Sequence, residues 1–361
     1  MKTIFIHIPM LIGIFVAAQL QAEPYLAVKT GLKCMSCHVN PTGGGKRNDF
    51  GRIYGQTSLY GGHREDTKLL STQIGEFLNI GGDGRFSASY RNIDESSDEF
   101  EFRTDSARLY FEFSLFDDRL VYYLDEQVAP GGATNRESYG LYWSEDRRFY
   151  VKAGRMFLPY GLRLEDDSAF IRQVSGISFA TPDLGVESGI ELQQWSFNLA
   201  INNGSGGGAE SNVGKQYSLR AEHIQALWRI GGSYNLNLGD NDDDRTMYNL
   251  FAGFKFGPMA WLMEFDRIED NSQPGPALRQ EVALLEGNVE FVRGHNLKLT
   301  YEYFDPDTDI EQNHRERYST VWEFVPLPMN QVRIGYRRNK GIPQNPLQNV
   351  NEIFIQNHIY F

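Results

Sequence analysis

The amino-acid sequence predicts an all-β fold, a transmembrane antiparallel β-barrel of about 16 strands, and two observations carry this prediction. From about residue 85 to Phe361, segments of roughly ten residues alternate between apolar and polar side chains and are rich in Tyr, Phe, Leu and Val. The links between these segments alternate in length, because each short turn is followed by a long polar loop. Short turns at one end and long loops at the other are typical of outer-membrane barrels.

The individual strands are predicted from side chains two positions apart. Between residues 106 and 115 every odd-numbered position is apolar, and most positions between them are polar. A strand here has one apolar face and one polar face. The same alternation recurs in the segments 217–221, 228–238, 248–256, 261–265 and 297–303. An even number of strands returns both chain ends to the periplasmic side, closure leaves no sheet edge in lipid, and a barrel of this size encloses an aqueous lumen.

The links complete the barrel prediction. The short links are 116–118, 144–146, 193–194, 225–226, 257–258, 293–294 and 326–329. The long links are 94–104, 127–136, 159–183, 202–214, 239–246, 270–278, 305–314 and 340–349. The longest, 159–183, contains two short apolar runs, so it could fold inward as a constriction or lie outside as a surface flap. The terminal Phe361, on an aromatic-rich last segment, resembles the assembly signal of outer-membrane barrel proteins.

The start of the chain indicates export. Residues 1–22 contain a Lys near the start, an apolar run at 4–16 and small residues toward position 22, which is the pattern of a secretory signal peptide. The net charge of −12 argues against nucleic acid as a partner. We therefore divide the chain into a signal peptide (1–22), a short N-terminal segment (23–80) and a barrel (81–361), and expect the protein in a bacterial cell envelope.

The N-terminal segment contains Cys34-Met35-Ser36-Cys37-His38, and Cys-x-x-Cys-His is the attachment signature of a c-type haem. The two thiols can each add across a vinyl group of one porphyrin, and the adjacent imidazole becomes the proximal iron ligand. Zinc would need two more ligands, with only His63 at hand, and a dithiol oxidoreductase would need a βαβ setting that the surrounding Gly, Pro and Asn residues do not suggest. The sequence therefore predicts one covalent haem c at Cys34, Cys37 and His38.

The second axial ligand is open between two histidines and a methionine. His63 is the first choice, as the one other histidine of segment 23–80, and with His38 it would complete the iron ligands. His358 is the rival, because its alternation with Ile353 and Ile355 points it into the lumen. A Met ligand would raise the reduction potential relative to paired imidazoles. About sixty residues are near the lower limit for an independent core, so segment 23–80 should plug or cap the periplasmic side, with the haem in or near the lumen.

A family resemblance adds to this interpretation. Ala-Val-Lys-Thr-Gly at 27–31, the Cys-x-x-Cys-His motif, Phe-Gly-Arg at 50–52 and a following barrel resemble the fused monohaem cytochrome–porins of the bacterial outer membrane, whose best-known members are proposed iron oxidases. The resemblance implies that Cys34 and Cys37 hold the haem and that His38 is its proximal ligand. It also implies electron transfer between periplasmic c-type cytochromes and an extracellular donor or acceptor, with Fe²⁺ as one candidate.

Two questions stay open at the level of sequence. One is whether the protein conducts electrons, with or without iron oxidase or reductase activity, or is a haem-plugged porin that passes solutes without a redox role. The other concerns the acidic clusters in the long loops at 94–99, 240–244 and 305–309. They could attract hard cations, bind divalent ions that bridge lipopolysaccharide, or simply be solvated.

Overall fold

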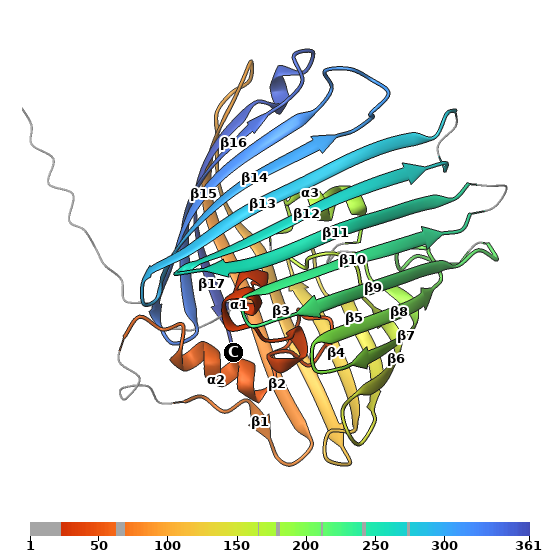
Figure 1. Cartoon of the computed structure of the whole chain (residues 1–361). Helices are drawn as coiled ribbons and strands as arrows, with labels where there is room; N and C mark the ends of the chain where they lie inside the picture. Colours follow the sequence, from red (N-terminus) through yellow and green to blue (C-terminus); the bar gives the residue numbers. More distant parts are fainter. Residues whose placement is uncertain are drawn as a thin grey trace, which may run out of the picture.

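The computed structural model describes residues 23–62, 69–164, 166–177, 181–210, 212–239, 243–272 and 275–361. Strands β2 to β17 each pair antiparallel with the next strand, and β17 pairs with β2, so the sheet closes on itself as a barrel of sixteen strands (Figure 1). The predicted fold class is confirmed. The predicted signal peptide at 1–22 lies outside the described residues.

The strands of the wall are long and regular. They are β2 (Leu78–Ile93), β3 (Glu99–Leu115), β4 (Leu120–Ala129), β5 (Thr134–Trp143), β6 (Phe149–Met156), β7 (Asp183–Glu191), β8 (Trp195–Asn202), β9 (Gln216–Ile224), β10 (Trp228–Asn237), β11 (Arg245–Phe256), β12 (Met259–Asp270), β13 (Leu278–Val292), β14 (His295–Asp305), β15 (Arg315–Leu327), β16 (Asn330–Lys340) and β17 (Val350–Tyr360). A two-residue strand, β1 (Gln73–Ile74), pairs with the start of β2. The first barrel strand thus begins at Leu78, slightly before the expected boundary at residue 81.

Alternate side chains of each strand face opposite sides of the wall. In β12, Met263 and Phe265 are exposed on the outside, while Glu264 and Asp266, which alternate with them, are buried inside. In β17, Ile353 and Ile355 are 56% and 49% exposed. An apolar outer face and a polar inner face are what a strand between lipid and an aqueous lumen requires.

The alternation of short and long links is confirmed from β6 onward, whereas the four earlier links, 94–98, 116–119, 130–133 and 144–148, are all four or five residues long. We call the two ends of the barrel the short-turn end and the long-loop end. Two of the long loops are shorter than expected, because the hairpins continue beyond the predicted strand ends: β3 begins at Glu99, opposite Arg91, and β5 begins at Thr134. A 3-10 turn, η3 (Pro346–Gln348), lies in the last long loop.

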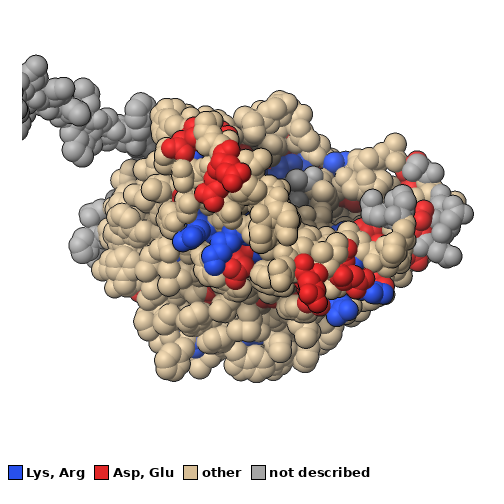
Figure 2. All heavy atoms as spheres, turned by 90° about the horizontal axis from the view of Figure 1, so that it is seen from above, with Lys and Arg blue, Asp and Glu red and all other residues tan. Residues whose placement is uncertain are grey.

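The acidic runs of the long loops have local partners. Seen from above, Asp and Glu side chains form several patches with Lys and Arg between them (Figure 2). Arg279 lies 3.4 Å from Asp309, and Arg245 lies 3.2 Å from Asp270. Asp307 accepts a hydrogen bond from the backbone N–H of Asp309. Many of these carboxylates therefore stabilise the loops themselves.

The segment ahead of the barrel, residues 23–62, lies inside the short-turn end, and we call it the plug (Figure 1). It contains α1 (Pro24–Thr30), the 3-10 turn η1 (Cys34–Ser36) and α2 (Asp49–Thr57). Helix α1 contacts β11 and β12. Gly31 lies against Ala226 in one short turn, and Gly61 lies against Gly294 in another. None of the helices in the described part of the chain is long and apolar enough to cross a membrane.

The described residues of the link between β6 and β7, which are 157–164, 166–177 and 181–182, fold into the lumen, and we call them the inner loop. Its helix α3 (Phe170–Ser175) contacts β12, β13 and β14. Phe170 and Ile171 are buried, in one apolar cluster with Tyr25 and Val28 of the plug. Of the two arrangements that the sequence left open, the inward one is therefore observed.

Candidate functional site in the barrel lumen

Helix α1 is fixed at both ends by its sequence and by the barrel wall. Pro24 occupies the first turn, where the missing N–H costs nothing, and Gly31 ends the helix in the left-handed conformation with φ of 70°. Glu23, just before the helix, pairs with Arg333 and lies 3.1 Å from Lys298. The Tyr25 hydroxyl donates to Glu323, and burial together with the carboxylates of Glu323 and Glu23 raises the pKa of Tyr25 well above its usual value.

The next turn brings together the three residues of the haem signature. The backbone N–H groups of Cys37 and His38 donate to the carbonyl oxygen of Cys34 at 3.1 and 3.0 Å, which closes a tight turn over residues 34–38. We call it the cysteine turn. Both cysteines are free thiols, and His38 is 5% exposed. Burial raises the pKa of the Cys37 thiol, so the thiol form is favoured near neutral pH.

A hairpin of residues 39–47 connects the cysteine turn to the wall. Its backbone N–H at Lys46 donates to the Tyr123 hydroxyl at 2.9 Å, and the Lys46 ammonium lies 2.8 Å from Glu112. Gly43 has φ of 91°, and a Cβ there would lie 3.1 Å from the Cys34 Cβ and 3.3 Å from its sulfur. A glycine at this position therefore keeps the space beside Cys34 open.

Helix α2 packs directly on the cysteine turn. Asn48 caps the helix, because its side chain accepts from the backbone N–H of Gly51, and its own N–H donates to the Cys37 carbonyl at 3.0 Å. A Cβ on Gly51 would lie 2.1 Å from that carbonyl oxygen. The Phe-Gly-Arg sequence at 50–52 thus has a physical role, since only glycine allows the helix to approach this closely.

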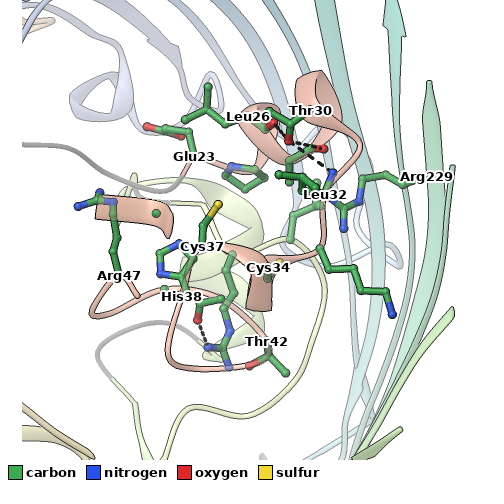
Figure 3. A pocket seen from close by; sticks show the side chains of 18 of the residues that line it. Glu23, Leu26, Thr30, Leu32, Cys34, Cys37, His38, Thr42, Arg47 and Arg229 are labelled. Atoms are coloured by element: carbon green, nitrogen blue, oxygen red, sulfur yellow. Dashed lines mark hydrogen bonds between the residues drawn. The ribbon is translucent and has the colours of Figure 1, made fainter. Parts of the chain in front are cut away.

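The cysteine turn opens into a cavity, which we call the cysteine cavity, with about 910 Å³ of empty space including the part open to solvent. Cys37 points toward α1 across this space, with His38 beside it (Figure 3). The plug, the inner loop and strands β9 and β10 form the walls. Its apolar lining comes from Leu26, Ala27, Leu32, Tyr54 and Leu59, and its charged lining from Glu23, Lys33, Arg47, Arg163, Arg220, Glu222 and Arg229.

The charged groups of the cavity carry a positive excess. Arg220 and Arg229 are both buried and both bond to one carboxylate, Glu222. Arg163 of the inner loop donates to the Gly43 carbonyl at 2.8 Å and so joins the loop to the plug. A haem needs apolar walls for its ring and cations for its two carboxylate side groups. The residues present fit such a group.

The structure separates the candidate iron ligands. His38 lines the cysteine cavity, and among the described residues that line it there is no second His and no Met. His63 lies outside the described residues. His358 points into the lumen as predicted but lines no part of this cavity. Both ring nitrogens have partners elsewhere, since Nε2 lies 2.6 Å from Asp83 and Nδ1 lies 3.4 Å from Gln331. Met35 packs against a cluster of wall tyrosines.

A second cavity lies between the inner loop and the wall formed by β2, β3 and β13 to β17, and we call it the polar cavity. It contains about 990 Å³ of empty space, including the part open to solvent. Glu23 lines both cavities. Across the polar cavity Asp166 of the inner loop pairs with Arg337. Burial of Asp166 opposes ionisation, but Arg337 and Arg317 outweigh it and hold the pKa of this carboxyl well below its usual range.

Sequence reasoning missed the groups that the wall and the inner loop supply. Arg220 and Arg229 were predicted only as inward polar positions of strands, Glu222 fell outside the predicted segment 217–221, and nothing local distinguishes the three from other lumen residues. Within the described residues, no three His, Cys, Asp or Glu side chains gather as a metal site.

Comparisons with known proteins bear on the barrel alone. No protein-family model matches the chain, and no curated protein is similar to it in sequence. Among solved structures, an anion-selective porin from Comamonas acidovorans is 11% identical with a TM-score of 0.61, and covers 79% of this chain and 99% of that one. The outer-membrane channel DcaP of Acinetobacter baumannii is 13% identical with a TM-score of 0.59, over 81% of this chain and 100% of that one. In-vitro folded OmpT, an outer-membrane protein of Vibrio cholerae, is 11% identical with a TM-score of 0.61, over 81% and 100%. The chain therefore has the sixteen-stranded fold of these porins and outer-membrane proteins.

Proposed function

We propose that this chain is a bacterial outer-membrane electron-transfer protein that carries one covalent haem c inside a porin-like barrel. The observation that carries the proposal is the position of the Cys-x-x-Cys-His motif. Cys34, Cys37 and His38 all line one cavity of about 910 Å³ within the lumen, and that cavity has the apolar and cationic lining that a haem requires. The apolar outer face of the strands supports the membrane location.

Each group of the cavity has a role in this proposal. Cys34 and Cys37 would form the two thioether bonds, and His38 would be the proximal iron ligand. The bound haem supplies one-electron exchange between ferrous and ferric iron. Leu26, Leu32 and the other apolar residues exclude water from the ring, while the shared ion pairs of Arg220 and Arg229 with Glu222 leave positive charge facing the cavity.

The position of the cavity also decides which partners fit. The apolar band of such a barrel is about 25 Å tall, so a single haem can serve both sides only from within the lumen. The plug lies at the short-turn end, which is the periplasmic end of such barrels, and a periplasmic c-type cytochrome is the natural partner there. The long loops at the other end face an extracellular donor or acceptor, with Fe²⁺ as one candidate.

The test is to express the full-length protein together with the haem-ligation machinery. Purified wild-type protein should carry one covalent haem per chain, and Cys37→Ser should lose the double attachment, whereas Ser36→Ala in the same turn should keep it. Colourless wild-type protein would refute the proposal. For holoprotein in proteoliposomes, an external reductant should reduce a trapped interior acceptor, and failure with every periplasmic cytochrome added would remove the transmembrane role.

A porin without a redox role is the second candidate, and the polar cavity favours it. Its lining mixes arginines with carboxylates in a space of about 990 Å³ beside the inner loop, and the similar solved structures include an anion-selective porin and an outer-membrane channel. In planar bilayers a porin should give steady ion conductance that persists in wild-type holoprotein. Conductance that appears only after the plug is displaced would count against this candidate.

A further inference from the structure

A cluster of buried oxygen atoms joins the inner loop to the barrel wall, on the β11–β12 side of the lumen. Glu264 and Asp266 both point inward from β12, and Asn249 lies directly opposite Asp266 in β11. Tyr160 and Gly161 of the inner loop cover them. The exposed fractions are 4% for Glu264, 0% for Asp266, 4% for Asn249 and 5% for Tyr160. We call these four side chains the oxygen cluster.

The hydrogen bonds of the cluster leave several oxygen atoms unused. Glu264 accepts from the Asn249 amide nitrogen at 3.0 Å and from the backbone N–H of Leu162 at 2.6 Å. The Asn249 amide nitrogen has a second N–H, and Asn249 also acts as a hydrogen-bond donor toward Asp266. Both carboxylate oxygens of Asp266, Oδ1 of Asn249 and the Tyr160 hydroxyl are buried without a hydrogen bond of normal geometry. Tyr160, Asn249 and Glu264 are the side chains that lie within hydrogen-bonding reach of Asp266.

The cluster brings two buried carboxylates together. Several buried carboxylates of the lumen have a cation beside them, as Glu302 has Arg317 and Glu187 has Lys152, but among the described residues Glu137 and Asp183 are also buried with hydrogen bonds and no ion pair. Within the described chain, neither Glu264 nor Asp266 forms an ion pair with Lys, Arg or His. Arg220, the cation that acts on Glu264, is already bonded to Glu222 and to the Gly161 carbonyl. A buried carboxylate pair without a cation is costly, so the pair must take up either a proton or a positive ion.

We propose that Glu264, Asp266, Asn249 and Tyr160 bind one hard divalent cation, and that Ca²⁺ is the ion that fits best. The donor atoms are all oxygens, with no thiol or imidazole, which suits Ca²⁺ or Mg²⁺ rather than Zn²⁺ or Cu²⁺. Ca²⁺ accepts irregular sets of carboxylate and amide oxygens, whereas Mg²⁺ demands near-ideal octahedral geometry. With only two carboxylates, the affinity should be that of weak extracellular Ca²⁺ sites, at about 10⁻⁴–10⁻³ M.

The bound ion would fasten the inner loop to the wall. The loop reaches the cluster closely, because a Cβ on Gly161 would lie 2.1 Å from a carboxylate oxygen of Glu264. Tyr160 lies on the loop and the other three residues lie on β11 and β12, so one ion contacts both parts. Removing the ion would leave the carboxylates uncompensated and loosen the loop.

The test compares Ca²⁺ binding by chelator-washed, detergent-solubilised full-length protein and its variants. In equilibrium dialysis at about 1 mM Ca²⁺, wild-type protein should retain one more ion per chain than Asp266→Asn. Glu302→Gln is the matched control, because Glu302 also anchors the inner loop, by accepting from the backbone N–H of Phe170, but already has Arg317 as its cation. That variant should bind Ca²⁺ as the wild type does.

A second measurement covers the case in which Asp266→Asn fails to fold. The rate of proteolysis of the inner loop in wild-type protein should fall about two- to tenfold when about 1 mM Ca²⁺ is added, because binding with a Kd of about 10⁻⁴–10⁻³ M lowers the open population by the factor 1 + [Ca²⁺]/Kd, and Mg²⁺ should protect less. Equal Ca²⁺ binding in wild type and Asp266→Asn, or inner-loop proteolysis that responds to pH but not to Ca²⁺, would indicate a shared proton instead and overturn the proposal. The Cys37→Ser variant should bind Ca²⁺ normally, so this result is independent of the haem.

Discussion

The contact between Gly51 and the Cys37 carbonyl makes Gly51→Ala a sharp test of how the cysteine turn is held. The added Cβ would lie 2.1 Å from that oxygen and 2.9 Å from its carbon, and real Cβ contacts essentially never fall below 3.0 Å. Because both opposing atoms are backbone, no side-chain rotation relieves the clash. Helix α2 must therefore move away by about 0.9 Å, which weakens the bond from the Asn48 N–H to Cys37.

The expected cost follows from three contributions. Forced backbone shifts in packed regions cost about 1–3 kcal/mol, and the weakened hydrogen bond from the Asn48 N–H to Cys37 adds about 1 kcal/mol. The better helix propensity of Ala returns about 1 kcal/mol. The net loss of about 2 kcal/mol corresponds to a roughly 30-fold larger population of opened plug, since each 1.4 kcal/mol is tenfold.

Limited proteolysis of the plug in the intact protein measures this population. Gly140→Ala is the control, because a Cβ at Gly140 meets nothing within 4 Å. Gly51→Ala should be cut about 30 times faster than the wild type, and Gly140→Ala at the wild-type rate. Equal rates for the two variants would refute the close approach of α2 to the cysteine turn.

Three further predictions concern the inner loop and the cysteine cavity. Phe170→Ala should destabilise the folded position of the inner loop by about 3–5 kcal/mol, because this ring is 5% exposed and packs in the lumen. The measurement is faster amide hydrogen exchange in α3. Val213→Ala is the control and should have no effect, because Val213 is 92% exposed. The pKa of Asp166 is depressed in the folded state, so the stabilisation of the loop by this carboxylate is complete above the usual Asp pKa range and is lost as the pH falls through the folded pKa. Hydrogen exchange of the loop, relative to the intrinsic rate at each pH, should therefore rise on acidification in the wild type. It should show a weaker pH dependence in Asp166→Asn. If the haem lies in the cysteine cavity, Arg229→Gln should lower its midpoint potential in a redox titration, because a removed positive charge favours ferric iron, and an unchanged potential would place the haem elsewhere.

The sequence predicted the barrel well because the signals for its strands are local. Alternation along ten residues determines which side chains face lipid, and the turn residues determine where each hairpin ends, so the strand number and the pattern of links from β6 onward were both recoverable. The two loops at 94–104 and 127–136 were overestimated, since polar residues there continue the ladder outside the apolar band.

The inner loop and the cavity walls could not be derived in this way. The position of the inner loop depends on partners far along the chain, such as Glu302, which accepts from the N–H of Phe170 across 132 residues. The Cys-x-x-Cys-His motif was readable because its three chemical groups lie within five residues. Arg220 and Arg229 became part of the site only through the closure of the barrel, and no short motif identifies them.

The plug precedes the barrel along the chain, yet the bonds that hold it reach strands near the end of the barrel. Tyr25 donates to Glu323, 298 positions later, and Glu23 pairs with Arg333, 310 positions later. Contacts of such sequence separation form late in folding because loop closure must come first. During biogenesis, Cys34 and Cys37 are therefore present in the chain before the barrel that encloses them has formed.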